Sequence, residues 1–329
     1  MPPSVRRGVL VVFVAISGAL LAAGAAAAGN GGLLPPEAHS PNAHRINQAY
    51  IFVLVFTGII FFVVEGALIA FAVRYRRGKR ARTAEGPQIH GATRLEIIWT
   101  VVPVVILATI GAFIFVILPG ISGPPAANAA NETNVTVEGR QFYWMFHYPN
   151  GAISIGTMVA PADQVVHEAV VSPDGDVNHS WWVPNLGGKI DAIPGKTNHT
   201  WFKAAGGTYI ARCAELCGVQ HALMTGHVTV VPRSHYNAFI ADRKANPGSI
   251  ALGKEEFDYV CSNCHRLDTR YIGPALRRNP LLHDRKGIET ILRKGVGLMP
   301  AVGSDWTDEQ IDALIAYTNT LRKKHGSQR

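Results

Sequence analysis

The sequence predicts a multidomain membrane protein, in which a two-helix transmembrane hairpin precedes a β-sandwich and an all-α domain. Three observations predict this class: two long apolar stretches early in the chain, a series of short strand patterns in its middle, and a polar, helical pattern after Pro232. With 329 residues the chain is long enough for more than one domain. Hydrophobic residues make up 48% and charged residues only 16%, a balance that favours membrane insertion.

Residues 1–28 have the pattern of a signal peptide, because two arginines precede an apolar run that ends in small residues. An uncleaved first membrane helix is the alternative. Two further apolar stretches, at 49–73 and 97–118, are each long enough to cross a bilayer core, which takes about 20 residues. They predict a transmembrane hairpin over residues 29–119.

The loop between the two spans carries much of the chain's positive charge. Its basic residues are Arg74, Arg76, Arg77, Lys79, Arg80, Arg82 and Arg94. The positive-inside rule therefore puts the loop in the cytoplasm and everything after Pro119 outside, which is the periplasmic side of a bacterial inner membrane. Glu65, inside the first span, is expected to face a protein partner or a water path. We see no basic groove interleaved with aromatic residues, so nucleic acid is not an expected partner.

The segment Cys213-Ala-Glu-Leu-Cys-Gly-Val-Gln-His-Ala-Leu-Met224 holds a dense set of metal-binding side chains, with His179 upstream. Sulfur ligands mixed with imidazole suit copper or zinc, and a Met beside Cys and His indicates electron-transfer copper. Two thiolates on one short loop are able to bridge two copper ions. The alternative is a disulfide between Cys213 and Cys217, or two buried thiols beside a core Met.

His179 followed by C-x-E-x-C-x-x-x-H-x-x-M resembles the binuclear copper (CuA) motif of cytochrome c oxidase subunit II. The resemblance implies that both Cys bridge the coppers and that each His binds one copper. It also implies that the Met and the backbone carbonyl of the Glu complete the coordination shells of the two coppers. The implied ligands are His179, Cys213, Glu215, Cys217, His221 and Met224. The family further places a magnesium or manganese ion on the carboxylate of that Glu, at the border with oxidase subunit I.

Residues 120–245 are expected to form the copper domain. After a linker rich in Gly, Pro and Ala, short strand patterns alternate with turn residues and no clear helix, which indicates a β-sandwich or barrel. The longer expected strands are 141–148, 165–171, 200–202, 208–211 and 227–231. Ligands split between one loop with His179 and a later loop suit a sandwich with its loops gathered at one end, and the family's cupredoxin fold has this shape.

Three other residues lie in segments that resemble the family, and a fourth departs from it. Glu96, at the entry to the second span, is either near the mouth of a proton path or an ordinary interfacial residue. Asp176 and Asp191 either join the magnesium network or serve as turn and capping carboxylates. Phe142 stands where many subunits II carry the Trp that receives electrons from soluble cytochrome c. This departure fits a tethered donor, whose high effective concentration removes the need for such a port.

Residues 246–329 are expected to form an all-α class I cytochrome c domain. Cys261-Ser-Asn-Cys-His265 has the C-x-x-C-H pattern of covalent haem attachment. In this pattern the thiols of Cys261 and Cys264 add to the haem vinyl groups, and the adjacent His265 reaches the iron. The alternative, a redox-active C-x-x-C pair, lacks the surrounding βαβ pattern.

The sixth iron ligand is expected to be Met299, in Gly-Leu-Met-Pro, and His283 is its rival. The context of Met299 is similar to the axial-Met loop of class I cytochromes c. The last helix is expected to begin at Thr307, where Thr-Asp-Glu-Gln310 has the pattern of a capping box.

The whole pattern resembles subunit II of a caa-type cytochrome c oxidase, with a cytochrome c fused behind the copper domain. The resemblance implies an electron-entry subunit of a respiratory haem-copper oxidase. Its donor would be a cytochrome c or a quinol-oxidising complex, and it would pass electrons through haem c and CuA to subunit I. Oxygen reduction and proton pumping belong to subunit I, so no catalytic residue is expected here. The alternatives are a CuA subunit of a nitric oxide reductase and a copper delivery protein.

Overall fold

The computed structural model describes residues 33–75, 86, 88, 90–124, 132–277, 279–280 and 284–326. The expected signal peptide, most of the basic loop and His283 lie outside these residues. The chain divides into two compact units. One consists of Met1–Pro36 and His44–Ser122, and the other of Glu37–Ala43 and Gly123–Arg329.

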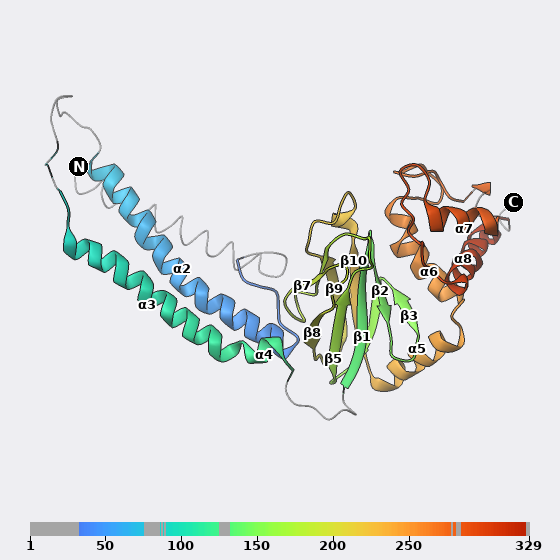
Figure 1. The fold of residues 1–329 in the computed structure, drawn as a ribbon, viewed down its shortest axis with the longest axis horizontal. Helices are drawn as coiled ribbons and strands as arrows, with labels where there is room; N and C mark the ends of the chain where they lie inside the picture. The colour runs from blue at the N-terminus through green and yellow to red at the C-terminus, as the bar shows by residue number, and fades with distance from the viewer. Residues whose placement is uncertain are drawn as a thin grey trace. The chain divides into compact units, whose positions relative to one another are not determined.

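The first unit contains two helices that are long and apolar enough to cross a membrane, α2 (Pro41–Arg74) and α3 (Thr93–Ile117). A one-turn helix, α4 (Pro119–Ser122), follows (Figure 1). Both long helices begin before the apolar stretches expected at 49 and 97, because helical geometry extends into the polar residues that flank each span. Most of their apolar side chains are exposed in the chain alone, as expected for surfaces whose solvent is lipid.

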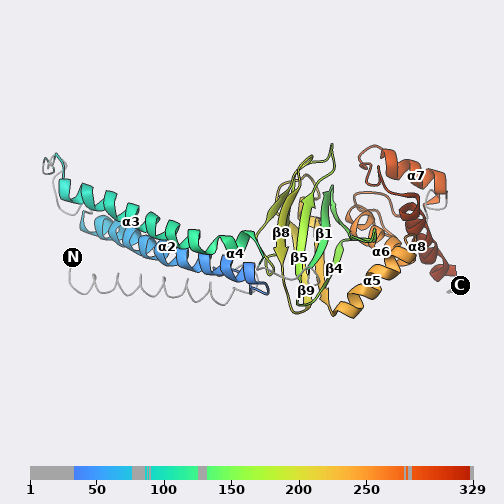
Figure 2. The same cartoon turned by 60° about the horizontal axis from the view of Figure 1, so that its bottom comes forward.

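The second unit contains a β-sandwich of two five-stranded sheets (Figures 1 and 2). The strands are β1 (Glu132–Arg140), β2 (Tyr143–His147), β3 (Ile153–Ile155), β4 (Thr157–Pro161), β5 (Val165–Val171), β6 (His179–Trp182), β7 (Ile190–Ala192), β8 (Asn198–Phe202), β9 (Gly207–Cys213) and β10 (Thr225–Val231). The sheet orders are β3-β2-β1-β5-β8 and β4-β10-β9-β6-β7. β1 runs parallel to β5, and β4 runs parallel to β10, whereas the other pairs are antiparallel.

Two expectations about the strands are wrong. The strand expected at 141–148 begins at Tyr143, because Gln141 and Phe142 form the turn between β1 and β2, with Arg140 opposite Tyr143. His179 is the first residue of β6 and does not lie on a loop. By contrast, β5 has the bounds expected from the sequence. β3 and β7 were not expected, because three residues are too few to show alternation.

The sandwich core packs around Trp144 and Trp181, whose rings lie edge to face with centroids 4.9 Å apart. Glu168 of β5 is buried beside them, and its Oε1 accepts a hydrogen bond of 2.9 Å from Trp181 Nε1. Burial raises the pKa of the Glu168 carboxyl to about 7, because the interior disfavours the charged form. The core therefore contains a carboxyl group that is neutral below this pH.

The rest of this unit is helical. The helices are α5 (Arg233–Ala245), α6 (Ile250–Tyr259), α7 (Arg285–Lys294) and α8 (Asp308–Gly326), with short 3₁₀ turns η3 (His221–Leu223) and η4 (Cys261–Asn263). α6 packs against α8 so closely that a Cβ at Gly253 would lie 1.9 Å from the Ala313 carbonyl oxygen. The expected capping box of α8 is confirmed, because Thr307 N donates to Gln310 Oε1 and Gln310 N donates to Thr307 Oγ1.

Replacing Gly253 with Ala tests this helix contact. The methyl group has no room beside Ala313, so α6 and α8 must separate, and we expect a loss of at least about 1–3 kcal/mol in the stability of the helical region. Chemical denaturation followed by circular dichroism measures the change. Lys254→Ala, on the exposed side of the same helix, is the control and should unfold at nearly the wild-type denaturant concentration.

Replacing Glu168 with Gln tests the buried carboxyl. Its folded pKa lies above its unfolded value, so its favourable contribution is present below about pH 4.5 and is lost as the pH rises through about 7. We expect Glu168→Gln to gain up to about 3 kcal/mol over wild type at pH 8 and little at pH 4.5. Parallel unfolding curves at the two pH values measure this difference. An equal effect at both would show that the carboxyl titrates normally.

Candidate metal centres

The expected copper ligands lie where two neighbouring strands end. β6 begins at His179 and pairs antiparallel with β9, which ends at Cys213, and Trp181 is the residue opposite Cys213. Two backbone hydrogen bonds fix the loop that follows. Ala214 N donates to Ser180 O at 2.9 Å, and Cys213 N donates to Met224 O at 3.0 Å. The second bond closes the loop on itself, so the ligands at its two ends are held together.

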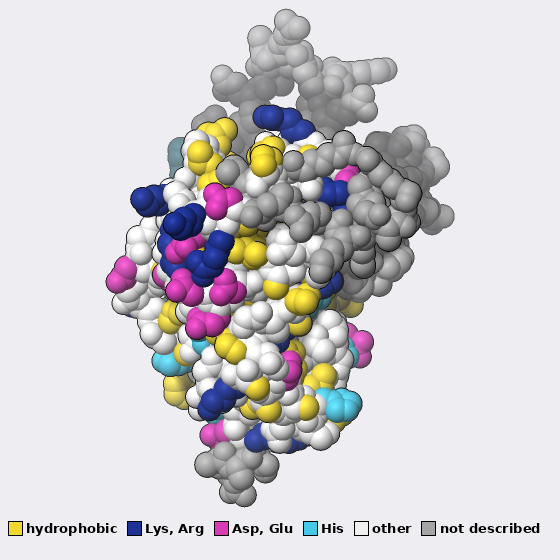
Figure 3. All heavy atoms as spheres, turned by 90° about the vertical axis from the view of Figure 1, so that its right-hand side faces the viewer, with side chains coloured by type: hydrophobic (Ala, Val, Ile, Leu, Met, Phe, Trp, Pro, Cys, Tyr) yellow, Lys and Arg dark blue, Asp and Glu magenta, His cyan; other side chains and the backbone are white. Residues whose placement is uncertain are grey.

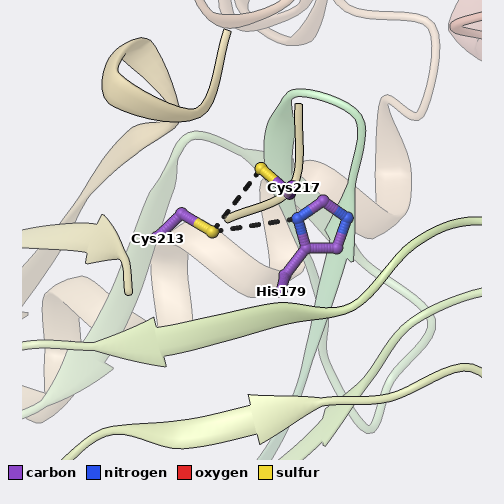
Figure 4. Close-up of side chains that lie close together, drawn as sticks. All are labelled: His179, Cys213 and Cys217. Atoms are coloured by element: carbon purple, nitrogen blue, oxygen red, sulfur yellow. Dashed lines mark hydrogen bonds between the residues drawn. The ribbon is translucent and has the colours of Figure 1, made fainter. Parts of the chain in front are cut away.

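The sulfur and nitrogen atoms converge (Figure 4). Cys213 Sγ lies 3.7 Å from Cys217 Sγ and 3.8 Å from His179 Nδ1, and it points toward both. Cys213 Sγ is also 3.2 Å from the backbone oxygen of Glu215. Cys217 Sγ lies 3.7 Å from His221 Nδ1 and 3.8 Å from Met224 Sδ.

These spacings exclude the alternative of a disulfide in this structure, because a disulfide has its sulfurs about 2.05 Å apart. They fit ligands of a shared metal. Atoms that each lie about 2.0–2.3 Å from one ion are separated from one another by several ångströms. All six atoms expected from the sequence are thus brought together, and both thiols, His179 and Met224 are buried.

The ionisable groups of the site shift one another's pKa values. A hydrogen bond from the Cys217 thiol holds the pKa of Cys213 well below its usual range, and the resulting thiolate raises the pKa of Cys217. Burial opposes the protonation of His179, but Asp176, whose Oδ1 lies 3.5 Å from Nε2, helps to raise the pKa of the imidazole. A carboxylate behind a ligating His fixes the ring's orientation in many metal sites. Sequence reasoning left this role of Asp176 open.

A residue that sequence reasoning missed is Gly139, on β1. A Cβ there would lie 2.9 Å from Trp144 Cζ3 and 3.1 Å from His179 Cβ. The absence of a side chain therefore lets the His179 side chain and the Trp144 ring approach β1 closely. Nothing in the sequence marks this glycine, because the contact joins residues 40 positions apart.

The haem-attachment segment forms a single 3₁₀ turn, in which His265 N donates to Cys261 O at 2.9 Å. Both thiols are free. The His265 Nδ1 atom lies 2.8 Å from Pro274 O, so Nδ1–H donates to this carbonyl and Nε2 is left for a metal. The ring packs on Gly273, where a Cβ would lie 2.3 Å from His265 Cε1. These residues fit an axial haem ligand of fixed orientation.

Met299 lies in a tight loop, where Val296 N donates to Met299 O and Met299 N donates to Val296 O, each at 3.0 Å. Its side chain is partly buried against the core that Cys261 also contacts. The expected sixth ligand thus lies in the same helical region as the expected attachment turn.

The remaining expected residues have local partners. Glu96 accepts a hydrogen bond from Ala92 N at 3.1 Å, in the first turn of α3. Asp191 lies on β7 opposite Ser180. In the part of the chain that the structure describes, His179, Cys213 and Cys217 form the only group of three or more His, Cys, Asp or Glu side chains close enough to share one ion.

Three family models match successive parts of the chain. They are the transmembrane domain of cytochrome c oxidase subunit II (residues 28–117), its periplasmic domain (156–231) and subunit III of the cbb3-type oxidase (248–317). The chain is 31% identical over 312 residues to cytochrome c oxidase subunit 2 of Alkalihalophilus pseudofirmus, covering 86% of this chain and 89% of that one.

The chain belongs to the cytochrome c oxidase subunit II family. It is also 30% identical over 286 residues to subunit 2 of Bacillus sp. strain PS3, which covers 75% of this chain and 80% of that one. The periplasmic domain of subunit II from Bradyrhizobium japonicum is 32% identical, with a TM-score of 0.34, and matches 37% of this chain and 96% of that domain.

Membership confirms the resemblance and the main lines of the predicted architecture. The subunit is a membrane protein with two candidate spans and an extramembrane cupredoxin-like sandwich, and its C-terminal helices form a cytochrome c-like domain. As a subunit II, it is part of a haem-copper oxidase and serves electron transfer. Its domains imply copper and haem as cofactors.

Replacing Gly139 with Ala tests the support behind His179. The methyl group would displace the His179 side chain or the Trp144 ring, and we expect copper affinity to fall about tenfold or more, as when a supporting residue of a metal site is lost. Copper titration of the purified protein measures this. Gly248→Ala is the control, because a Cβ there meets its nearest atom at an ordinary 3.5 Å. Wild-type copper affinity in Gly139→Ala would contradict the expectation.

Proposed function

We propose that this chain is the electron-entry subunit of a caa-type oxidase. Cys261, Cys264, His265 and Met299 would hold a haem and a second set of ligands would hold a binuclear copper centre, and these groups would supply electron transfer from a donor protein to oxidase subunit I. The copper ligands are His179, Cys213, Glu215 through its carbonyl, Cys217, His221 and Met224. The bound groups supply one-electron chemistry, and oxygen is reduced on subunit I.

One observation carries this proposal: six donor atoms of the types that suit copper converge at 3.2–3.8 Å around two free thiols. The chain's own residues do the rest of the work. The strand ends fix the positions of the ligands, burial keeps water from the thiolates, and the Asp176 carboxylate lies 3.5 Å from His179 Nε2, close enough for an ion pair. A rigid ligand set changes little when one electron is gained or lost, which keeps the barrier to transfer low.

The outer side of the copper loop supports a protein partner there. Its apolar side chains Leu216, Val219 and Leu223 are exposed, with Val219 at 92%, while the ligands beside them are buried. An apolar rim over a buried centre is typical of a surface that another protein covers. We assign it to oxidase subunit I, and the Glu215 carboxylate would there contribute to the shared magnesium or manganese ion.

The cytochrome-like domain has a surface of mixed charge. On the face shown in Figure 3, basic and acidic side chains lie interspersed. The ion pairs Arg285–Asp312, Arg293–Glu289 and Arg293–Asp308 connect α7 and α8 or lie within α7. Neither positive nor negative charge dominates the described part of this face. Long-range electrostatic attraction from this face therefore does not by itself select the donor, a cytochrome c or a quinol-oxidising complex. We place both metal domains on the periplasmic side, following the charge of the loop between the spans.

Metal and spectral analysis of the purified chain, expressed with copper and haem supply, tests the proposal. We expect two coppers and one haem per chain, with the seven-line EPR pattern of an electron shared by two equivalent coppers. One copper with a four-line signal, or zinc in its place, would overturn the binuclear assignment. A nitric oxide reductase subunit would give the same metal content, and it is separated by purifying the catalytic subunit that accompanies this chain.

Replacing Met299 with Leu separates the iron ligand from its rival His283. If Met299 binds the iron, the variant loses the visible absorption band of Met–iron ligation, and its haem potential falls, because a Met ligand raises it. The copper EPR signal should not change. A retained band would assign the sixth position to another residue.

A further inference from the structure

The turn between β1 and β2 contacts every segment of both proposed metal sites except His179. It consists of four successive residues, Arg140 to Tyr143. The first and last of these bind the loop that follows Met299. Arg140 forms two hydrogen bonds of 2.5 Å to the two carboxylate oxygens of Asp305. Tyr143 OH donates to Val302 O at 2.9 Å and accepts from Trp306 Nε1 at 3.0 Å.

The two middle residues of the turn reach the other two segments. Gln141 Nε2 donates to the backbone oxygen of Cys217 at 2.9 Å, so the turn is fastened to the copper loop. Phe142 O accepts from Asn263 Nδ2 at 3.1 Å, and Asn263 lies between the two haem-attachment cysteines. The Phe142 ring also lies against Gly218, where a Cβ would be 3.0 Å from Cε1. Two hydrogen bonds and a few covalent bonds therefore connect the attachment turn to a copper ligand.

These contacts are buried enough to hold one geometry. Arg140, Tyr143 and Trp306 are each less than a tenth exposed, and Glu138 pairs with the other side of Arg140. The Tyr143 and Trp306 rings meet edge to face at 6.4 Å. A bidentate carboxylate–guanidinium pair fixes orientation as well as distance. Burial opposes the charge of Arg140, but Asp305 outweighs it and raises the pKa of the guanidinium, while burial raises the pKa of the Tyr143 hydroxyl. At physiological pH, the Arg140 guanidinium is therefore positively charged and the Tyr143 hydroxyl is neutral.

We propose that this turn is the docking element that orients the cytochrome-like domain on the copper domain, with Arg140, Tyr143, Asp305 and Trp306 as its positioning residues. The inference rests on the proposed function. It also names the residues that set the distance between the proposed haem site and the proposed copper site. Only residues 246–249 separate α5, whose Tyr236 belongs to the sandwich core, from α6. A domain that loses the contacts of this turn keeps those of α6 with the sandwich, where Ile155 N donates to Glu255 at 3.0 Å and the Tyr259 hydroxyl lies 3.1 Å from Thr157 Oγ1, and we expect it to shift about these remaining contacts.

Two variants test the dock without touching a metal ligand. Asp305→Asn removes the charge that holds Arg140, and Tyr143→Phe removes the hydroxyl but keeps the ring. Asp312→Asn is the matched control, because it breaks an exposed ion pair with Arg285 at 3.0 Å within the same helical region. The full chain is used in detergent, both with its metals and without them.

The first measurement is deuterium uptake of the peptide that contains residues 300–306, followed by mass spectrometry, which needs no metal. The second is the rate at which one electron moves from ferrous haem to the oxidised copper pair after photochemical reduction of the haem. We expect both variants to take up deuterium faster and to transfer the electron about tenfold more slowly or worse, because small misplacements of reacting groups have effects of this size. Their copper EPR signals and haem spectra should match those of wild type and of Asp312→Asn.

Wild-type exchange and wild-type transfer rates in both variants would overturn the proposal. Slower transfer with unchanged exchange would overturn it too, because the residues would then act on a metal site and not on docking. A failure of the proposed function shows elsewhere, as missing copper or haem in the wild-type protein, and the exchange measurement on the metal-free chain remains decisive in that case.

Discussion

The pairing of β6 with β9 is the constraint on which the rest of the copper site depends. It brings His179 to the end of the strand that leads into the two thiols, across 34 residues of sequence. The hydrogen bonds from Ala214 and Cys213 then close the loop, so the backbone fixes where the ligands lie. Gly139 and Trp144 complete the arrangement from the opposite sheet, where any larger side chain at Gly139 would collide with the site.

The helical region is built on a similar principle of close backbone approach. Gly253 lets α6 meet α8, and Gly273 lets His265 lie flat against the segment that holds its Nδ1. Both proposed metal sites thus use glycine to place a ligand or a helix where a Cβ would not fit. The contacts of the β1–β2 turn then join the two regions through the buried side chains of Arg140, Tyr143 and Trp306.

Much of this architecture could be predicted from the sequence, because its signals are local. The spans follow from apolar length, the capping box from Thr307 and Gln310, and the ligand spacing from residues 213–224. What could not be predicted depends on contacts between distant residues. His179 has no strand signal of its own, and it becomes part of β6 only because β9 and β7 pair with that segment. Gln141 and Phe142 continue an aromatic run that resembles a strand, yet the hairpin register makes them its turn.

The packing of α6 against α8 places the first and last helices of the cytochrome-like domain side by side. A domain whose first and last helices pack together has its own core. Such a domain can be fused to another domain through one short linker without rearranging the core of either. The four residues between α5 and α6 are such a connection. In modular terms, the fusion required a short joint, the β1–β2 turn, and a few polar contacts between α6 and the neighbouring strands of the sandwich.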